Sequence, residues 1–314
     1  MGKKLVIIGA GVSGLSAGIY ALQAGYSVEI YEKNKMPGGE CTGWNRQGYH
    51  IDNCINFLVG CNKDEQLYKM WENLGVISDS LKIYREPYFY CMNMDGITLH
   101  LWRNLEKARK EFLELAPEDT KELNLFFDCV KTLECIKPPC DISIAHMNLI
   151  QFIKLGMSMK DANKAIKEYG KQPMEEFVNR FKNHYIRAMF KNYFNSNFNA
   201  LSFVASYAFF TSNTAAIPEG GSVGLVGRML AKFESLGGKL HLGINIVKIN
   251  IVDSQVVSIL GNNGEVIKSD NYIWCADPHY LFYDLIDEKY LDKNLRYMYD
   301  NPQGYVSNTC YQVA

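Results

Sequence analysis

Residues 4–32, KLVIIGAGVSGLSAGIYALQAGYSVEIYE, decide the fold of this chain. The apolar, β-branched run at 5–8 predicts a buried strand, and the helical pattern of 15–24 ends at Gly25. A second strand is predicted at 28–31. The order strand, glycine turn, helix, strand is typical of two parallel strands joined by a crossover helix.

The turn between the first strand and the helix has three glycines, and each meets a steric demand of a dinucleotide site. The first permits the tight turn, the second lets the backbone approach a pyrophosphate, and the third lets helix and strand pack closely. The helix N-terminus then offers free N–H groups to the phosphates. Glu32 ends the second strand, where a carboxylate can accept hydrogen bonds from the ribose hydroxyls. The same negative charge would repel a 2′-phosphate, which argues against NADP. A glycine-rich turn with a solvent-facing acid is the plainer alternative, but all five parts agree. The predicted contacts are Gly9, Gly11, Val12, Ser13, Gly14, Glu32 and Lys33.

Length and composition narrow the class of protein. The chain has 314 residues, 47% of them hydrophobic, which suits two domains or one elaborated domain. Its 33 basic and 34 acidic residues give a net charge of -1 and no reason to expect a nucleic-acid partner. The N-terminal apolar run is short and enters the glycine turn directly, so we interpret it as a strand and not as a signal peptide.

The nine cysteines include no C-x-x-C pair, so we predict no metal site. An odd number of cysteines without a secretory signal favours a protein of the reducing cytoplasm. The apolar stretches 147–159 and 201–217 are too interrupted to span a bilayer, although attachment to a membrane surface stays open. No histidine arrangement or pair of acids predicts a catalytic residue.

The rest of the chain suggests a nucleotide domain interrupted by an insert. Helical patterns dominate from 64 to 215, with a strand-like aromatic stretch at 84–101. A helix with Ser222 as its N-cap is then expected, followed by short alternating strands. We therefore predict an α/β fold with a three-layer, mostly parallel sheet, a small β-meander, and an inserted α+β, mostly helical domain. The predicted parts are 1–63 and 216–280 for the nucleotide domain, 64–215 for the insert, and 281–314 for the start of a second insert segment.

Three motifs in this order resemble a known family. They are the 9–14 glycine turn with its acid, MPGG at 36–39 leading into GYHID at 48–52, and IPEGG at 217–221 followed by strands. Together they resemble the FAD-dependent amine-oxidase-like oxidoreductases, in the branch of phytoene desaturase, carotenoid isomerase and retinol saturase. The resemblance implies a Rossmann-like domain that binds FAD.

The same resemblance implies further cofactor contacts. It places Gly38, Gly39, Glu40 and Thr42 near the diphosphate and flavin, the Val247 backbone at the adenine, and Ala276 beside the cofactor. Val247 and Ala276 could equally be ordinary strand core. Relatives often have a basic residue at the position of Glu40 and a small one at that of Cys54. We expect the Glu40 side chain to turn to solvent or to pair with Arg46, so that any contact is through its backbone.

The leading functional hypothesis is an FAD-dependent oxidoreductase that desaturates, saturates or isomerises C–C bonds of a polyene, isoprenoid or other lipid-like substrate. A non-redox lipid carrier of related fold, like the escort proteins of prenylated GTPases, is the alternative. An NAD-dependent dehydrogenase is disfavoured by the Gly38–Gly39 loop. Relatives are longer and close over the flavin with a C-terminal segment, so we expect a truncated chain that holds FAD weakly. The aromatic residues that could line a substrate cavity, or simply form core, are Tyr88, Phe89, Tyr90, Phe203, Tyr207, Phe209 and Phe210.

Overall fold

The computed structural model describes residues 2–301 apart from 138, 139, 141, 195 and 197. Its chain divides into two compact units. The first comprises Met1–Asn56, Trp71–Leu81 and Pro218–Ala314, and the second comprises Phe57–Met70 and Lys82–Ile217. The domain boundaries at residues 63, 215 and 280 stay a prediction from the sequence, and the strand expected at 306–313 lies outside the described residues.

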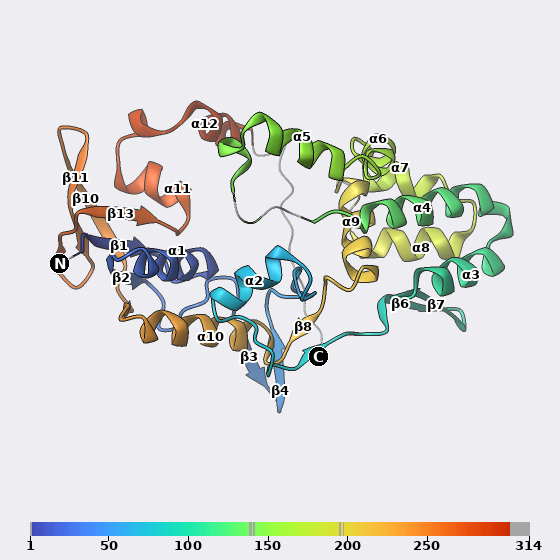
Figure 1. Cartoon of the computed structure of the whole chain (residues 1–314), viewed down its shortest axis with the longest axis horizontal. Coiled ribbons are helices and arrows are strands. Elements are labelled where there is room, and N and C mark those ends of the chain that lie inside the picture. Colours follow the sequence, from blue (N-terminus) through green and yellow to red (C-terminus); the bar gives the residue numbers. More distant parts are fainter. Residues whose placement is uncertain (1, 138–139, 141, 195, 197, 302–314) are drawn as a thin grey trace. The chain divides into compact units, whose positions relative to one another are not determined.

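A parallel four-stranded sheet organises the first unit (Figure 1). Its strand order is β13 (Asn271–Trp274), β1 (Lys4–Ile8), β2 (Ser27–Glu32) and β9 (Lys239–Leu242). Strand β1 is central and buried from its second residue onward, which explains its unbroken apolar sequence. The predicted parallel, Rossmann-type sheet is confirmed.

Helices cover one face of this sheet and a β-meander covers the other. Gly18 of α1 (Val12–Gln23) lies so close to Ile30 of β2 and Phe233 of α10 (Gly221–Ser235) that a Cβ there would approach them to 3.2 and 2.8 Å. Tyr31, the next residue of β2, faces the opposite side and packs with the meander. The meander strands are β10 (Ile246–Val252), β11 (Gln255–Gly261) and β12 (Val266–Ile267).

The hairpin β3 (Gly43–Arg46) and β4 (Tyr49–Asp52) supplies a cap for α10 from far away in the sequence. The Asp52 carboxylate accepts a 2.7 Å hydrogen bond from the Ser222 backbone N–H. The predicted Ser222 N-cap is therefore wrong: the N-cap is Gly220, with φ of +83°, and Ser222 lies inside the helix. The unit also contains α11 (Pro278–Tyr280), a π-helix at Leu281–Leu285, a 3-10 turn at Glu288–Tyr290 and α12 (Lys293–Asp300).

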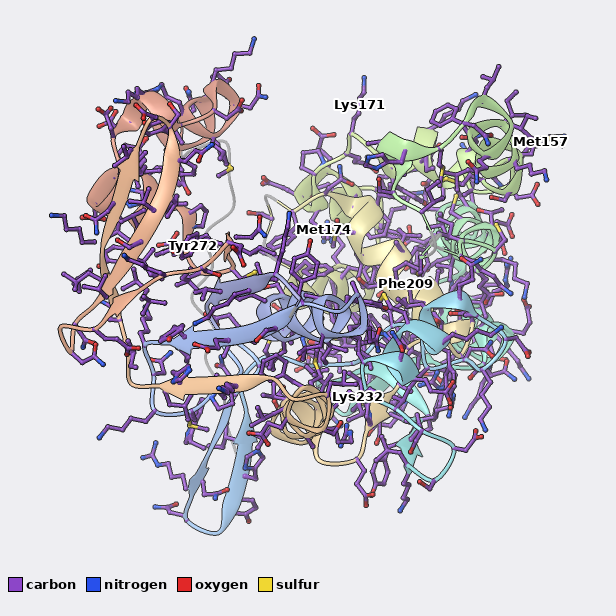
Figure 2. The ribbon with its side chains drawn as sticks, turned by 60° about the vertical axis from the view of Figure 1, so that its left-hand side comes forward. Met157, Lys171, Met174, Phe209, Lys232 and Tyr272 are labelled. Atoms are coloured by element: carbon purple, nitrogen blue, oxygen red, sulfur yellow. The ribbon has the colours of Figure 1, made fainter. Side chains whose placement is uncertain are left out.

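The second unit is mainly helical, with a hairpin of β6 (Tyr88–Met94) and β7 (Ile97–Trp102). Its core is a cluster of aromatic rings, in which Phe203 lies 5.3 Å from Phe190 and 5.9 Å from Phe126 between ring centroids. Figure 2 labels Met174 and Phe209 in this unit. The helices are α3 (Leu105–Leu115), α4 (Thr120–Leu133), α5 (Leu149–Ser158), α6 (Asn163–Tyr169), α7 (Met174–Asn179), α8 (His184–Tyr193) and α9 (Ala200–Thr211).

The short elements complete the chain. Helix α2 spans Gln66–Asn73, the two-residue strands β5 and β8 span Ile83–Tyr84 and Ile217–Pro218, and 3-10 turns span Pro117–Asp119 and Ile144–His146. Among the described helices, none is long and apolar enough to cross a bilayer.

The aromatic residues that the sequence suggested as a cavity lining belong largely to the aromatic core of the second unit. Phe203, Tyr207 and Phe210 are buried, and Phe89 and Phe209 pack against the same cluster. The Tyr207 hydroxyl donates a 2.6 Å hydrogen bond to the Trp102 carbonyl, so its polar atom is satisfied inside the core. Ordinary packing therefore accounts for most of the aromatic set.

Candidate nucleotide-binding site

A cavity of about 1170 Å³ opens in the first unit at the carboxyl ends of β1, β2 and β13. From β1 the chain continues to β2 on one side, while β13 flanks it on the other. Ligands of open α/β sheets bind at such a switch point, outside the carboxyl ends of the strands. The volume exceeds the usual range for drug-sized ligands, which suits a larger molecule such as a dinucleotide.

Two glycines of the 9–14 turn lie so close to neighbouring backbone that neither position could hold a side chain. Gly9 has φ of +101°, and a Cβ there would lie 2.8 Å from the Cys275 carbonyl oxygen. A Cβ on Gly14 would lie 1.9 Å from the Gly9 carbonyl oxygen. The first and third glycines thus serve the turn and the contact between helix and strand, as the motif predicts.

A second glycine loop lies directly against the first. The Gly38 N–H donates a 2.9 Å hydrogen bond to the Ala10 carbonyl, and Gly11 and Gly38 form an isolated parallel bridge. Gly38 and Gly39 have φ of +128° and +58°, and a Cβ on Gly39 would come within 3.4 Å of the Gly11 Cα. The two loops form a cradle of bare backbone along the cavity.

Glu32 is buried at the cavity wall, with 5% of its surface exposed. Its two carboxylate oxygens accept backbone N–H bonds of 2.8 Å from Ala10 and 2.9 Å from Asn34. Each oxygen has a further lone pair, so the carboxylate can still accept ligand hydroxyls. The acid therefore fixes both loops beside it and keeps acceptor capacity for a ribose.

The N-terminus of α1 supplies the complement for an anion. Its N-cap, Gly11, makes no side-chain capping bond, and the first turn has no acidic residue. Val12 and Ser13 line the cavity, and Lys33 adds a cationic side chain to the lining. Free N–H groups and the positive end of the helix dipole favour phosphate here. The groups present thus fit a dinucleotide, with phosphates at α1 and a ribose at the acid.

Most of the residues predicted for the site meet at this cavity. Its lining includes Gly9, Gly11, Val12, Ser13, Glu32, Lys33, Gly38, Gly39, Glu40 and Ala276. Three others do not line it. Gly14 packs helix against strand, Thr42 lies behind the loop with its methyl 3.2 Å from a Cβ position on Gly38, and the exposed Val247 follows the lining residue Ile246.

The side chain of Glu40 is exposed, as one of the two predicted arrangements required. Its carboxylate accepts a 3.5 Å hydrogen bond from the Asn53 side chain, and its carbonyl accepts a 3.1 Å bond from the same amide. No ion pair with Arg46 occurs among the described residues. The acid is thereby directed toward β4 and solvent.

Several lining residues were not predicted because they carry no local signal. Most of them come from the segment after β9, the end of β13 and α11, which meet only in the folded chain, and the others adjoin predicted residues in β1, β2 and the loop after β2. Cys275 is one of them: burial raises the pKa of its thiol, and a hydrogen bond with Ser13 partly opposes the shift. The unpredicted residues are Ile8, Tyr31, Asn34, Cys41, Ile244, Asn245, Ile246, Trp274, Cys275, Asp277 and Tyr280.

Comparison with known proteins supports the interpretation of this cavity. Residues 7–74 match the model of the NAD(P)-binding Rossmann-like domain family. Over 315 aligned residues the chain is 25% identical to 4,4'-diaponeurosporene oxygenase of Staphylococcus aureus, covering 98% of this chain and 62% of that protein. The chain is a homologue of that oxygenase. It spans about three fifths of the length of the curated relatives it matches.

Solved structures share the fold. An oxidoreductase from Methanosarcina mazei is 20% identical, with a TM-score of 0.55 over 96% of this chain and 65% of that one. A cofactor-site variant of putrescine oxidase is 18% identical, with a TM-score of 0.56 over 96% and 63%. The resemblance to the amine-oxidase-like oxidoreductases, predicted from the motifs, is confirmed. No group of three or more metal-ligating side chains occurs among the described residues.

Proposed function

We propose that this chain carries the dinucleotide site of an FAD-dependent oxidoreductase. The observation that carries the proposal is Glu32, buried at the cavity wall and bonded to Ala10 and Asn34, beside two interlocked glycine loops. A single glycine turn would serve NAD equally well. The additional Gly38–Gly39 loop on the same cavity supports FAD.

Each part of the site has a role in holding the cofactor. The α1 N-terminus binds the phosphates through backbone N–H groups, and Glu32 accepts the ribose hydroxyls. The bare backbone of Gly11 and Gly39 allows close approach without a side-chain clash. When bound, FAD supplies the hydride transfer itself, and the protein supplies orientation and exclusion of water.

The substrate we propose is a polyene, isoprenoid or other lipid-like molecule, with desaturation, saturation or isomerisation of C–C bonds as the reaction. Support comes from the oxygenase homologue, whose name denotes a carotenoid-type substrate, along 98% of this chain. Flavin enzymes of this kind need few catalytic side chains. None is assigned here.

A non-redox lipid carrier is the second candidate function, since proteins of one fold can differ in activity. The deciding experiment mixes the protein, loaded with oxidised or with reduced FAD, anaerobically with a detergent-dispersed carotenoid-type polyene and follows the flavin and polyene absorbance. A flavin-dependent change in polyene absorbance supports the oxidoreductase: desaturation bleaches oxidised flavin, saturation reoxidises reduced flavin, and isomerisation leaves the flavin unchanged. Retention of flavin and polyene with no spectral change in either supports the carrier, and loss of flavin at the first step rejects the cofactor assignment itself.

We also propose that the protein attaches peripherally to a membrane through α5. Five large apolar side chains of this helix are exposed, by 50% for Ile153 up to 74% for Leu149. Met157, exposed by 71%, is one of them and is labelled in Figure 2. Such a helix can lie in the membrane interface with its apolar face in the acyl boundary. Flotation with anionic vesicles tests this: Ile150→Glu should abolish co-flotation, whereas equal flotation of wild type and variant rejects α5 as the contact.

A further inference from the structure

Two cysteines lie next to each other just beyond the open end of the β3–β4 hairpin. The ladder pairs Gly43 with Asp52 and continues outward with a 2.8 Å hydrogen bond from the Asn53 N–H to the Thr42 carbonyl. One further step of the same register would bring Cys41 opposite Cys54, in agreement with the hydrogen bond between their side chains. Facing residues of antiparallel strands have Cα atoms about 4.5–5.5 Å apart, within the range of about 4.4–6.8 Å that disulfides require.

The two thiols contact each other and differ in exposure. Their side chains are hydrogen-bonded to each other. Burial, followed by the neighbouring Cys54 thiol, raises the pKa of Cys41 to about 11. Cys54 is exposed, whereas Cys41 is partly buried and lines the cavity. An oxidant in solution therefore reaches Cys54 first, with Cys41 in place to react second.

We propose that Cys41 and Cys54 form a reversible intramolecular disulfide at the border of the cavity. The oxidant is a small-molecule disulfide such as oxidised glutathione. The Cys54 thiolate attacks one sulfur of the oxidant and releases one glutathione thiolate. The Cys41 thiolate then attacks the Cys54 sulfur and releases the second. Two protein thiols lose two protons and two electrons, and one glutathione disulfide becomes two thiols.

The disulfide would tie the Gly38–Cys41 loop to the end of β4. Gly38 and Gly39 of this loop line the cavity and meet the first glycine turn. Oxidation thus fixes backbone that borders the ligand, which gives the site a response to thiol redox conditions. Disulfides of reducing compartments are typically transient and redox-sensing. The inference concerns only the two thiols and does not depend on which ligand occupies the cavity.

The experiment incubates the full chain with oxidised glutathione and maps tryptic peptides without reduction. Formation of the bond joins peptide 36–46 to peptide 47–63. Because the second peptide also contains Cys61, the link must vanish in Cys54→Ser. The exposed Cys135, on another part of the chain, reports oxidant reactivity in every sample.

Cys41→Ser is the matched control, because it leaves the attacking thiol and removes the resolving one. In wild type, the Cys41 thiol competes with free glutathione for the mixed disulfide at Cys54, at an effective concentration of about millimolar or more. With about 0.1 mM free glutathione, glutathionylation of Cys54 should therefore be about tenfold lower in wild type than in Cys41→Ser. Equal glutathionylation of Cys54 in both proteins, with no joined peptides in wild type, overturns the proposal. A link that persists in Cys54→Ser overturns it as well.

Discussion

Replacement of Glu32 by glutamine tests how the acid holds the two loops. The carboxylate accepts bonds from the N–H groups of Ala10 and Asn34, at 2.8 and 2.9 Å, and is almost fully buried. Glutamine keeps one acceptor oxygen and turns an NH₂ group toward the other N–H. Loss of one hydrogen bond to a charged group, with a buried donor left unpaired, costs about 2–3 kcal/mol.

Urea unfolding of Glu32→Gln measures this cost, and hydrogen exchange of the two bonded amides locates it. A local loss of about 2 kcal/mol corresponds to about thirtyfold faster exchange at the amide that loses its acceptor. Glu40→Gln removes the same charge from an exposed side chain near the same cavity, and should change stability by less than about 0.5 kcal/mol. Equal effects of the two variants, or unchanged exchange at both amides in Glu32→Gln, would refute the reasoning.

Three further predictions concern packing, pH and a partly buried cation. Gly14→Ala should cost about 2–3 kcal/mol in urea unfolding, because its Cβ would lie 1.9 Å from a carbonyl oxygen of the turn. Gly156→Ala, with no atom within 4 Å, should instead stabilise α5 by about 0.5–1 kcal/mol. Burial raises the pKa of Cys61 from 9.0 to about 11, so the folded state keeps the thiol protonated where the unfolded chain already ionises. The contribution of the buried thiol to the free energy of unfolding is therefore complete below pH 9 and is lost as the pH rises through 11. Between pH 9 and pH 11, the free energy of unfolding should therefore fall by about 2–3 kcal/mol less in Cys61→Ala than in wild type, as measured by urea unfolding. The Arg103 guanidinium donates to backbone carbonyls from two nitrogens, from Nε to Glu86 at 2.9 Å and from Nη1 to Phe210 at 2.6 Å, a fork that lysine cannot reproduce. Arg103→Lys should lower stability by about 1–2 kcal/mol in thermal unfolding, and an unchanged midpoint would contradict this role.

Local sequence signals predicted the first unit well. The strand and helix of 4–24 carry complete start and stop signals, so β1 and α1 form as expected. The N-terminus of α10 was placed wrongly, because Asp52 caps it from 170 residues away and no local pattern reveals such a partner. The apolar stretches at 147–159 and 201–217 overlap α5 and α9, which lie in the region predicted to be mostly helical but were not given bounds of their own. Helix α9 depends on packing, since most of its residues are buried, whereas α5 has no buried residue and begins at a local capping box of Asn148 and Gln151.

The candidate site divides in the same way. Gly9, Gly11 and Glu32 could be predicted because a motif of fixed spacing defines their roles. The resemblance was needed for Gly38 and Gly39, since glycine pairs occur in many loops. Tyr280 and Asn245 reach the cavity from segments that sequence spacing does not connect, and a 3.5 Å hydrogen bond joins their side chains. Such convergence depends on the folded sheet.

Binding of FAD by the purified chain bears most closely on the proposed dinucleotide site. The protein is passed through a desalting column equilibrated with FAD, so that weak binding is also detected, and bound flavin is measured from its two visible absorption bands, with Glu32→Gln treated in parallel. We predict flavin bands in the wild type that the variant loses wholly or in large part. Absence of flavin from the loaded wild-type protein, or equal displacement of bound FAD by NAD, would contradict the account.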